Sequence, residues 1–375
     1  MRIALVTEYN PDDRFARSGV VNSIYMQLRK FADVVWIDPA PNSGYRLCLF
    51  KALLKIIYWL HKCNYKVTRH LPLITNLYAR EIKLKLPKDV DGLFFFDSYH
   101  FAKLKIDIPI FFRNDSVFHQ MVGYYYFNIP HLFVKLSDKI EYEAMNRMSI
   151  MFSPSNWVRK CIEEHYSGNQ KKVIVIESGA NLYRTPVYTP KNIDLSQVNL
   201  LFIGYQSRRK RVELAAECCR LLNEQYHINS KLTIIGKDVP KEIIDAYYVN
   251  YMGPIDKNKD EGYQLYEEVL SRAHILVFPT KAECAGIVVC EASAYGIPTV
   301  SCDTGGIANY VIDGENGILL NVTDTADKYA QIIFDMITSK KYQIYSQKAR
   351  FFYETKFNWD IWGNKVCKIM ENIIC

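Results

Sequence analysis

Short apolar runs alternate with longer amphipathic segments along the first half of the chain. The runs have the length of buried strands, and the segments between them have the length of helices. This alternation is typical of strands and crossover helices in a parallel sheet. The expected strands are 2–7, 33–38, 92–96, 109–113, 149–152 and 172–176. The pattern predicts an N-terminal α/β domain, which we place at residues 1–185.

A second series of the same kind follows. Its expected strands are 199–203, 231–235, 248–252, 274–278 and 298–302. The stretch 182–198 has two prolines and no helical periodicity, which indicates a connection between domains. We therefore place a second α/β domain at 186–355 and a C-terminal helix at 356–375. The apolar positions that recur at helical spacing in that last segment are Trp359, Trp362, Val366, Ile369 and Ile373.

Composition agrees with two globular domains and limits the partners. The chain has 375 residues, of which 49% are hydrophobic and 23% charged. A formal charge of +7 favours an anionic partner, such as nucleic acid, a lipid surface or a phosphorylated small molecule. No run of about 18 uncharged apolar residues is present, so we expect no transmembrane helix.

The ten cysteines predict neither disulfides nor a metal site. No Cys-x-x-Cys pair occurs, and the other cysteine spacings match no zinc template. The sequence starts with a strand pattern and no signal segment precedes it. We therefore expect a cytoplasmic protein with free, buried cysteines.

The most informative segment runs from Phe278 to Gly296. A strand ends in this segment, a loop carries Glu283, and a helix begins near Gly286. Open α/β sheets bind ligands beyond the carboxyl ends of their strands, and free amides at a helix start bind anions. The amides of Gly286 and Ile287 therefore suit a phosphate group.

Two glutamates bracket this expected anion site. Glu283 lies just before the helix, and Glu291 lies about five residues inside it, roughly 7 Å along its axis. Because carboxylates accept hydrogen bonds from hydroxyls, the pair suits a nucleotide sugar, with Glu291 on the ribose and Glu283 near the transferred sugar. Both could instead be surface glutamates, but the helix around Glu291 is apolar on most sides, and a buried carboxylate needs a partner.

Four consecutive cations, residues 208–211, follow the first strand of the second domain and the residue Gly204. We expect them at the start of a helix, where the macrodipole disfavours each cation by about 0.3–1 kcal/mol. A bound diphosphate would reverse that penalty, because Arg209 and Lys210 could join the helix amides on the anion. A solvated basic turn is the alternative, and it is the more common use of such a run.

A third loop follows the strand 298–302. It contains Thr304, Gly305 and Gly306, and its glycines would let the backbone approach a ligand closely. Glycine pairs more commonly make turns, so this loop carries little weight by itself.

Taken together, these motifs resemble the retaining nucleotide-sugar glycosyltransferases of family four, over most of the chain. The similar features are two glutamates separated by seven residues, the following Ala-Ser-Ala-Tyr-Gly-Ile-Pro-Thr-Val, and Asp-Thr-Gly-Gly. The stretches 153–159 and 177–181 also look like members that act on bacterial surface glycans. The resemblance implies a GT-B fold, in which two Rossmann-like domains face each other across a cleft and the C-terminal helix packs back on the N-terminal domain.

The resemblance also implies residue roles. Glu291 binds the ribose, Glu283 contacts the donor sugar, and Lys210 with Arg209 neutralises the diphosphate. The remaining donor-side residues are Gly286, Ile287, Gly19, Gly204, Thr304, Gly305 and Gly306.

The chain departs from the family pattern at three positions. Tyr205 stands where arginine is common, Arg211 where glycine is common, and Ala285 where phenylalanine is common. These departures leave open whether Arg208 or Arg209 supplies the missing charge.

Residues of the first domain also follow strands. Gly19 lies between the first strand and a helix, where family members place a glycine loop that admits the donor phosphate. Asp115 and His119 follow the strand 109–113, and either could orient the acceptor, although lone histidines after strands are more commonly structural. No G-x-G-x-x-G or P-loop motif is present, which argues against a nicotinamide cofactor and a P-loop enzyme.

Asp89-Val90-Asp91 resembles the D-x-D metal motif of other glycosyltransferases. It precedes its strand and therefore lies at the wrong end of the sheet for a ligand, so we interpret it as a strand-entry turn. Charge neutralisation by Lys210 and Arg209 also removes the need for a divalent ion. We expect no metal and no cofactor besides the nucleotide-diphosphate sugar.

The segment 46–70 contains no acidic residue. On a helical wheel its cations share one face, opposite Leu53, Ile57 and Leu60. These cations are Lys51, Lys55, Lys62, Lys66 and Arg69. Such a helix could rest on anionic lipids at the inner face of a membrane and meet a lipid-linked acceptor, with a solvated face as the alternative.

The sequence thus predicts a metal-independent hexosyltransferase that retains configuration and uses a glycan or lipid-linked acceptor, in bacterial surface polysaccharide synthesis. Alternatives are a nucleotide-sugar epimerase or phosphorylase on the same fold, or a non-catalytic basic binding module. The glutamate spacing speaks against the first two. We expect no nucleic-acid partner, because no such motif occurs and Glu283 and Glu291 would repel its phosphates.

Overall fold

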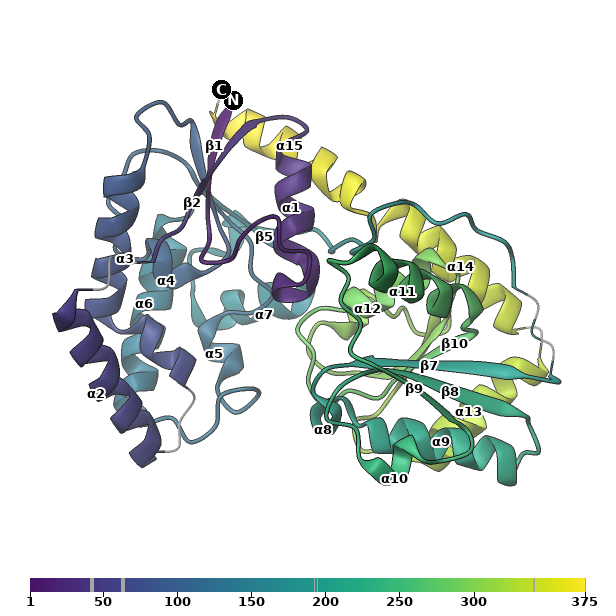
Figure 1. Cartoon of the computed structure of the whole chain (residues 1–375). Coiled ribbons are helices and arrows are strands. Elements are labelled where there is room, and N and C mark those ends of the chain that lie inside the picture. The colour runs from purple at the N-terminus through teal and green to yellow at the C-terminus, as the bar shows by residue number, and fades with distance from the viewer. Residues whose placement is uncertain (41–43, 62–64, 192, 194, 340, 375) are drawn as a thin grey trace. The chain divides into compact units, whose positions relative to one another are not determined.

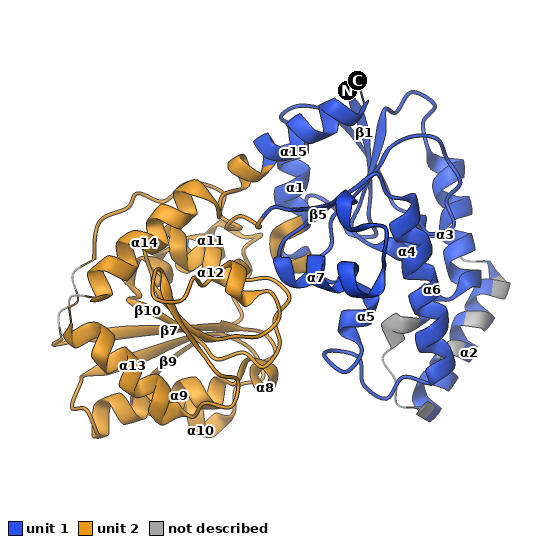
Figure 2. Ribbon diagram, turned by 180° about the vertical axis from the view of Figure 1, so that it is seen from behind, with its two compact units in different colours: residues 1–16, 21–176, 363–375 blue, residues 17–20, 177–362 orange. Residues whose placement is uncertain are grey.

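The computed structural model describes the chain except for residues 41–43, 62–64, 192, 194, 340 and 375. Contacts between Cα atoms divide it into two compact units (Figure 2). Unit 1 comprises Met1–Ala16, Val21–Ile176 and Gly363–Cys375, and unit 2 comprises Arg17–Val20 and Glu177–Trp362. The expected connection at 182–198 therefore lies at the start of unit 2.

Unit 1 is built on a six-stranded parallel sheet, sheet 1, with the order β2-β1-β3-β4-β5-β6. Its strands are β1 (Arg2–Val6), β2 (Asp33–Ile37), β3 (Gly92–Phe95), β4 (Ile110–Phe112), β5 (Ile150–Ser153) and β6 (Val173–Val175). The helical elements between them are η1 (Ala16–Gly19), α1 (Val20–Leu28), α2 (Tyr45–His61), η2 (Tyr65–His70), α3 (Pro72–Lys85), α4 (Ser98–Phe101), α5 (Phe118–Met121), α6 (His131–Arg147), α7 (Asn156–His165) and η3 (Gln170–Lys172). Every strand expected from the apolar runs of this domain is present.

Unit 2 contains a second six-stranded parallel sheet, sheet 2, with the order β12-β11-β10-β7-β8-β9. Its strands are β7 (Val198–Gly204), β8 (Ser230–Gly236), β9 (Val249–Gly253), β10 (Ile275–Phe278), β11 (Thr299–Cys302) and β12 (Gly317–Leu320). Its helical elements are α8 (Ser207–Lys210), α9 (Val212–Glu224), α10 (Lys241–Ile244), α11 (Asp260–Arg272), α12 (Ile287–Ala294), η4 (Ile307–Asn309), α13 (Ala326–Thr338), α14 (Lys341–Thr355) and the first turn of α15 (Trp359–Ile374). The sequence did not predict β12, a short edge strand of four residues.

Sheet 2 is buried on both faces, which is why its strands are continuous apolar runs. Successive side chains of a strand point to opposite faces. Along β7, Leu200 and Phe202 belong to one core, and Leu201 and Ile203 belong to another. Figure 1 shows α9 and α13 on the first face and α11 and α12 on the second.

Each sheet has one point at which the strand order reverses. In sheet 2 the chain runs outward through β7, β8 and β9 and then returns to place β10 on the other side of β7. The helices that follow β7 and β10 therefore cover opposite faces of sheet 2. The segments that lead out of these two strands, 205–211 and 279–286, diverge at the carboxyl ends of the strands. This is the position at which open α/β sheets bind ligands. The corresponding point of sheet 1 lies between β1 and β3.

The C-terminal helix α15 divides between the units at Trp362. Its later part packs on unit 1, where Gly363 lies so close to Gln27 of α1 that an added Cβ would be 2.5 Å from Gln27 Oε1. Near the end of the helix, Ile374 Cδ1 would lie 3.3 Å from a Cβ on Gly92 of β3. The first turn, with Trp359, belongs to unit 2.

The expected single helix across 46–70 is wrong. The helix α2 ends at His61, and Tyr65–His70 form the separate element η2. Arg69 turns away from any shared basic face, because its Nη1 donates to Glu8 (2.6 Å) and to Tyr99 Oη (3.0 Å).

On α2 the apolar side of the expected helical wheel is only partly covered. Ile57 packs against the core of unit 1, whereas Leu53 and Leu60 are 52% and 63% exposed. Lys62 and the side chain of Lys66 lie outside the described residues. No helix in the described part of the chain is both long and apolar enough to cross a membrane.

We predict that Gly236→Ala destabilises unit 2. A Cβ at Gly236 would lie 2.0 Å from the carbonyl oxygen of Gly204, its partner across β7 and β8, so the strands must move apart. Overpacking of this kind costs typically about 1–3 kcal/mol. The melting temperature should fall by several degrees, whereas Gly44→Ala, where no atom of the described residues lies within 4 Å of the added Cβ, should leave it unchanged. Equal melting temperatures for both variants would contradict the prediction.

Candidate active site

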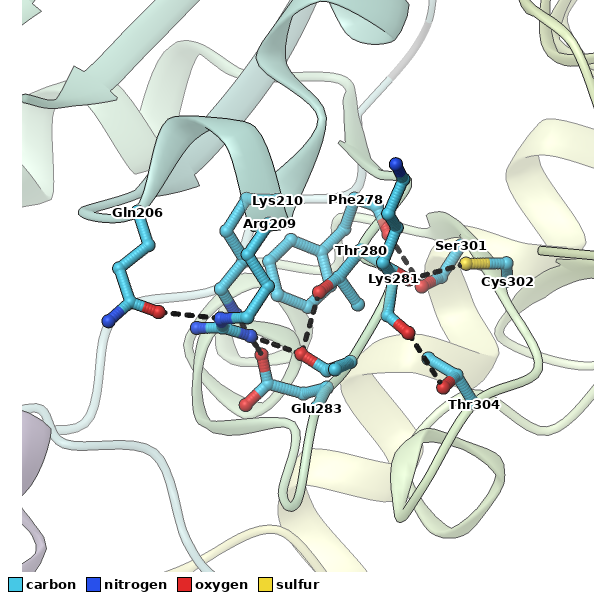
Figure 3. Close-up of polar contacts among 11 residues, drawn as sticks. Gln206, Arg209, Lys210, Phe278, Thr280, Lys281, Glu283, Ser301, Cys302 and Thr304 are labelled. Atoms are coloured by element: carbon cyan, nitrogen blue, oxygen red, sulfur yellow. Dashed lines mark hydrogen bonds and ion pairs between the residues drawn. The ribbon is translucent and has the colours of Figure 1, made fainter. Parts of the chain in front are cut away.

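A buried ion pair joins the two loops at the reversal point of sheet 2 (Figure 3). Lys210 Nζ, at the end of α8, donates to Glu283 Oε2, in the loop after β10. Their side chains are only 10% and 15% exposed. The Lys210 ammonium also lies 4.2 Å from the ring centroid of Phe278, the last residue of β10. Charges this far from water need a partner, so each side chain fixes the position of the other.

Burial lowers the pKa of Lys210 well below its ordinary value, and the charge of Arg209 acts in the same direction. The carboxylate of Glu283 opposes this shift, because it stabilises the ammonium form. An anionic ligand that replaced Glu283 beside Lys210 would have the same effect. The pair is therefore suited to exchange its internal carboxylate for an external anion.

Arg209 flanks the pair on its more exposed side. Its Nη1 lies 3.6 Å from Glu283 Oε2 and donates to the carbonyl of Ala282, and its Nε donates to Gln206 Oε1 (2.6 Å). Arg208 is exposed to solvent. Of the two arginines that the sequence left open, Arg209 is therefore the one that faces Glu283.

The four cations do not share one helix start, contrary to the expectation from sequence. The helix α8 ends at Lys210 and α9 begins at Val212, with Arg211 between them in the left-handed conformation at φ 55°. Glycine, which is common at this position in the family that the sequence resembles, adopts this conformation most easily. Arg211 adopts it while its guanidinium donates to Pro279 O, Val322 O and Cys302 Sγ. These contacts give Arg211 a structural role in joining the loops.

Glycines and a threonine hold the ion pair in place. Gly204 lies under Lys210, since a Cβ there would be 2.9 Å from Lys210 Cγ. In the third loop, Thr304 Oγ1 donates to Lys281 O (3.1 Å) and Gly306 N donates to Glu283 O (3.0 Å). Gly305 between them has a left-handed φ of 56°. The third loop thus fixes the segment that carries Glu283.

The helix α12 begins at Ile287, as the sequence predicts. Gly286 precedes it and packs on Tyr310, so that an added Cβ would lie 2.9 Å from Tyr310 Cβ. The first amides of any helix lack intrahelical acceptors. Those at Gly286 and Ile287 follow the loop that carries Glu283, and they give the start of α12 a positive partial charge.

Glu291 lies within α12 and is 2% exposed. Its Oε1 accepts a hydrogen bond from Lys257 Nζ (2.9 Å), and its Oε2 accepts one from Tyr266 Oη (2.5 Å). The sequence predicted that a buried Glu291 needs partners, but it did not identify them. Lys257 lies in the loop after β9 and Tyr266 in α11, and no local motif marks either residue.

The loop after β1 ends in a strained turn around Gly19. Arg17, Ser18 and Gly19 are all left-handed, with φ of 48°, 59° and 88°. A residue other than glycine costs on the order of 1–3 kcal/mol in such a conformation, and strain of this kind is typical of ligand-binding loops. Asn181 Nδ2 donates to Ser18 O and Asn181 Oδ1 accepts from Trp359 Nε1 (2.8 Å), which tethers the turn within unit 2.

Asp115 and His119 belong to unit 1 and are not part of the Lys210 cluster. Asp115 follows β4, and its backbone N–H donates to Asn114 Oδ1 (2.9 Å). His119 Nδ1 lies 3.5 Å from Asp138 Oδ2, and its ring stacks on that of His165 at a centroid distance of 3.7 Å. These contacts fix the His119 ring.

A polar cluster that the sequence did not indicate lies at the reversal point of sheet 1. Glu8, just after β1, accepts from Arg69 Nη1 and from Tyr78 Oη (2.8 Å). Glu141, which is 1% exposed, accepts from Ser98 Oγ (2.6 Å). These side chains come from separate segments, so no local pattern could bring them together in the sequence.

Asp89 and Asp91 precede β3 and both contact Arg2, in the strand-entry turn that the sequence predicts. Within the described ranges, no group of three or more His, Cys, Asp or Glu side chains is arranged to hold a metal ion.

A cavity of about 420 Å³ lies at the opposite edge of sheet 2 from the ion pair. Its lining includes Asn199, Lys231 and Val249, which stand at the amino-terminal ends of β7, β8 and β9. Since ligands of open α/β sheets bind at the carboxyl ends, we place the active site at Lys210 and Glu283.

We predict that Lys210→Met lowers the melting temperature more than Lys210→Met combined with Glu283→Gln does. The single change leaves a mostly buried carboxylate without its nearest cation, at a cost of about 3–5 kcal/mol, and removing both charges relieves most of that cost. Breaking the exposed Arg272–Glu268 pair by Arg272→Met should change stability by less than about 1 kcal/mol. Equal effects of Lys210→Met and Arg272→Met would contradict a buried pair.

Part of unit 2 is similar to a known protein family. Residues 197–339 match the family described as Glycosyl transferases group 1. The lipopolysaccharide glucosyltransferase WaaG of Escherichia coli K12 is 25% identical over 172 residues, which cover 45% of this chain and 46% of WaaG. The D-inositol 3-phosphate glycosyltransferase of Arthrobacter sp. FB24 is 27% identical over 180 residues, which cover 44% and 41%. The matched segments thus span less than half the length of these relatives.

The solved structure of WaaG has a TM-score of 0.64 at 15% identity, over 98% of this chain and 99% of that chain. At this identity the likeness shows the fold, which here extends over both units. Residues 197–339 are therefore similar to the group 1 glycosyl transferases, and the chain has the α/β fold of the GT-B type with two Rossmann-like domains.

Proposed function

We propose that this chain transfers a hexose-type sugar from a nucleotide-diphosphate sugar to a glycan or lipid-linked acceptor, with retention of configuration and without a metal ion. The proposed setting is bacterial surface polysaccharide synthesis. The match to a lipopolysaccharide glucosyltransferase supports that setting.

The observation that carries this proposal is the contact of two cations, Lys210 and Arg209, with the Glu283 carboxylate. In sugar transfer, the bond between the anomeric carbon and a diphosphate oxygen breaks, and negative charge grows on the diphosphate. Two cations beside a helix N-terminus are arranged to stabilise that charge. A divalent ion would supply the same stabilisation, so the two side chains support a metal-independent reaction.

Glu283 takes a second role in the proposed complex. When the diphosphate becomes the counter-ion of Lys210, the Glu283 carboxylate accepts hydrogen bonds from hydroxyls of the transferred sugar. Glu291 lies further along α12 and is assigned to the ribose. The donor therefore extends along the start of α12, with its sugar at Glu283 and its nucleoside at Glu291.

The acceptor is assigned to unit 1, with Asp115 and His119 after β4 as its proposed contacts. The donor base stays open. A structural relative, HepE from Anabaena, is described as a complex with UDP and glucose, and it has a TM-score of 0.63 at 13% identity over 99% of this chain and 100% of that chain.

We predict that a nucleoside diphosphate raises the melting temperature of the chain without added metal. We also predict that Lys210→Ala lowers kcat for sugar transfer from the matching sugar nucleotide. The panel is UDP, GDP, ADP, CMP and their common sugar conjugates. Loss of a group that stabilises the leaving diphosphate should reduce kcat about 10²–10³-fold, with a smaller change in KM. The control is Arg220→Ala, which removes a partly exposed cation of α9. An unchanged kcat in Lys210→Ala, or no response to any nucleotide, would refute the proposed function.

We also propose that α2 rests on an anionic membrane and brings the enzyme to a lipid-linked acceptor. Large apolar side chains of α2 are exposed, and Trp59 among them is 73% exposed. Lys51 and Lys55 are exposed on the same helix, which has no acidic residue. An exposed apolar surface with cations and an aromatic residue is typical of helices that lie in the membrane interface.

If α2 contacts an anionic membrane, the chain should bind vesicles that contain phosphatidylglycerol and should bind vesicles of pure phosphatidylcholine more weakly. Each lysine near an anionic surface contributes about 1 kcal/mol, so Lys51→Gln with Lys55→Gln should weaken binding about 30-fold in co-sedimentation. Lys160→Gln, on the exposed face of α7, serves as the control. Equal binding of the double variant and the control would exclude this role of α2.

A further inference from the structure

The pair formed by Lys257 and Glu291 has the chemistry of a hydroxyl-binding site. Lys257 Nζ donates to Glu291 Oε1 at 2.9 Å, and it lies 4.8 Å from the ring centroid of Tyr266, whose Oη donates to Glu291 Oε2. The Lys257 side chain is 12% exposed, and that of Glu291 is 2% exposed. Lys257 is therefore the outer member of the pair, and a ligand that approaches Glu291 meets it first.

Two tyrosines hold the loop that carries Lys257. Tyr183 Oη donates to the carbonyl of Lys257 (2.8 Å), and Tyr205 Oη donates to the carbonyl of Ile255 (3.2 Å). In the family that the sequence resembles, the position of Tyr205 is commonly an arginine. The loop after β9, which these two hydrogen bonds hold, thus places the Lys257 ammonium beside Glu291 of α12.

The pair leaves hydrogen-bonding capacity unused. An ionised carboxylate has about four lone-pair sites, and an ammonium has three donors. Lys257 and Tyr266 occupy one site on each carboxylate oxygen, and Glu291 occupies one donor of Lys257. A hydroxyl both donates and accepts, so a diol can donate to Glu291 and accept from Lys257 at the same time.

We propose that Lys257 and Glu291 together bind the ribose diol of the donor, with Tyr266 fixing the carboxylate, and that this makes the site selective for ribonucleotides. The inference rests on the proposed function, because it takes the donor to be a nucleotide sugar. It adds Lys257 as a residue that contacts the substrate and determines its specificity.

The groups around Glu291 show which side chain balances its negative charge. The titratable groups that face Glu291 are Lys257, Tyr266, Tyr205 and Cys290. Burial raises the pKa of Tyr266 and of Cys290 well above their ordinary values, and burial also raises the pKa of Tyr205. These three groups are therefore neutral near pH 7, and Lys257 supplies the positive charge.

The test is calorimetric titration of the full chain with UDP, GDP and ADP and with their 2′-deoxy and 3′-deoxy forms. For the base that binds, the wild type should prefer the ribonucleotide roughly 10-fold or more, because a hydroxyl bound between two charged groups is lost in the deoxy form. Lys257→Met should reduce this ratio to less than about 3-fold. Lys257→Arg, which keeps the charge and the donors, should retain most of the ratio.

The matched control is Lys259→Met, which removes an exposed lysine two residues away and should leave the ratio unchanged. If Lys257→Met does not fold, Lys257→Gln is measured by the same ratio. A wild-type chain that binds none of the nucleotides overturns the proposed function itself. If the wild-type chain binds one of the nucleotides and Lys257→Met shows the same ratio of ribonucleotide to deoxynucleotide affinity, this inference alone is overturned.

Discussion

The ion pair between Lys210 and Glu283 is the contact on which the donor side of the molecule depends. It joins the loops after β7 and β10, the strands at which the winding of sheet 2 reverses. Two charges so far from water are stable only together, so the pair fixes both loops. The neighbouring residues fit around it, since Gly204 leaves room for Lys210 and Gly306 holds the backbone of Glu283.

A second pair of lysine and glutamate, Lys257 with Glu291, lies further along the same helix. The two pairs correspond to the two ends of the proposed donor. In the proposed complex the diphosphate competes with Glu283 for Lys210 and separates the first pair, whereas the diol binds beside Lys257 and Glu291 in the second. The proposal therefore assigns a larger rearrangement to the diphosphate end than to the ribose end.

Local patterns were enough to predict every strand of the two sheets except β12, and the placement of Glu283 and Glu291. Continuous apolar runs specify strands that are buried on both faces, and the residues after them lie at the ligand-binding edge. Long-range contacts could not be predicted in this way. Lys257 has no motif, Arg211 adopts a conformation that its residue type does not favour, and Arg69 leaves the expected helical face because Glu8, 61 residues earlier, binds its guanidinium.

The most direct test of this account is a crystal structure of the chain with the nucleoside diphosphate that stabilises it. The account predicts the diphosphate between Lys210 and Arg209 at the start of α12, with Glu283 separated from Lys210 and the ribose at Glu291. An intact ion pair between Lys210 and Glu283, with the nucleotide bound elsewhere, for example in the cavity at the amino-terminal edge of sheet 2, would contradict it.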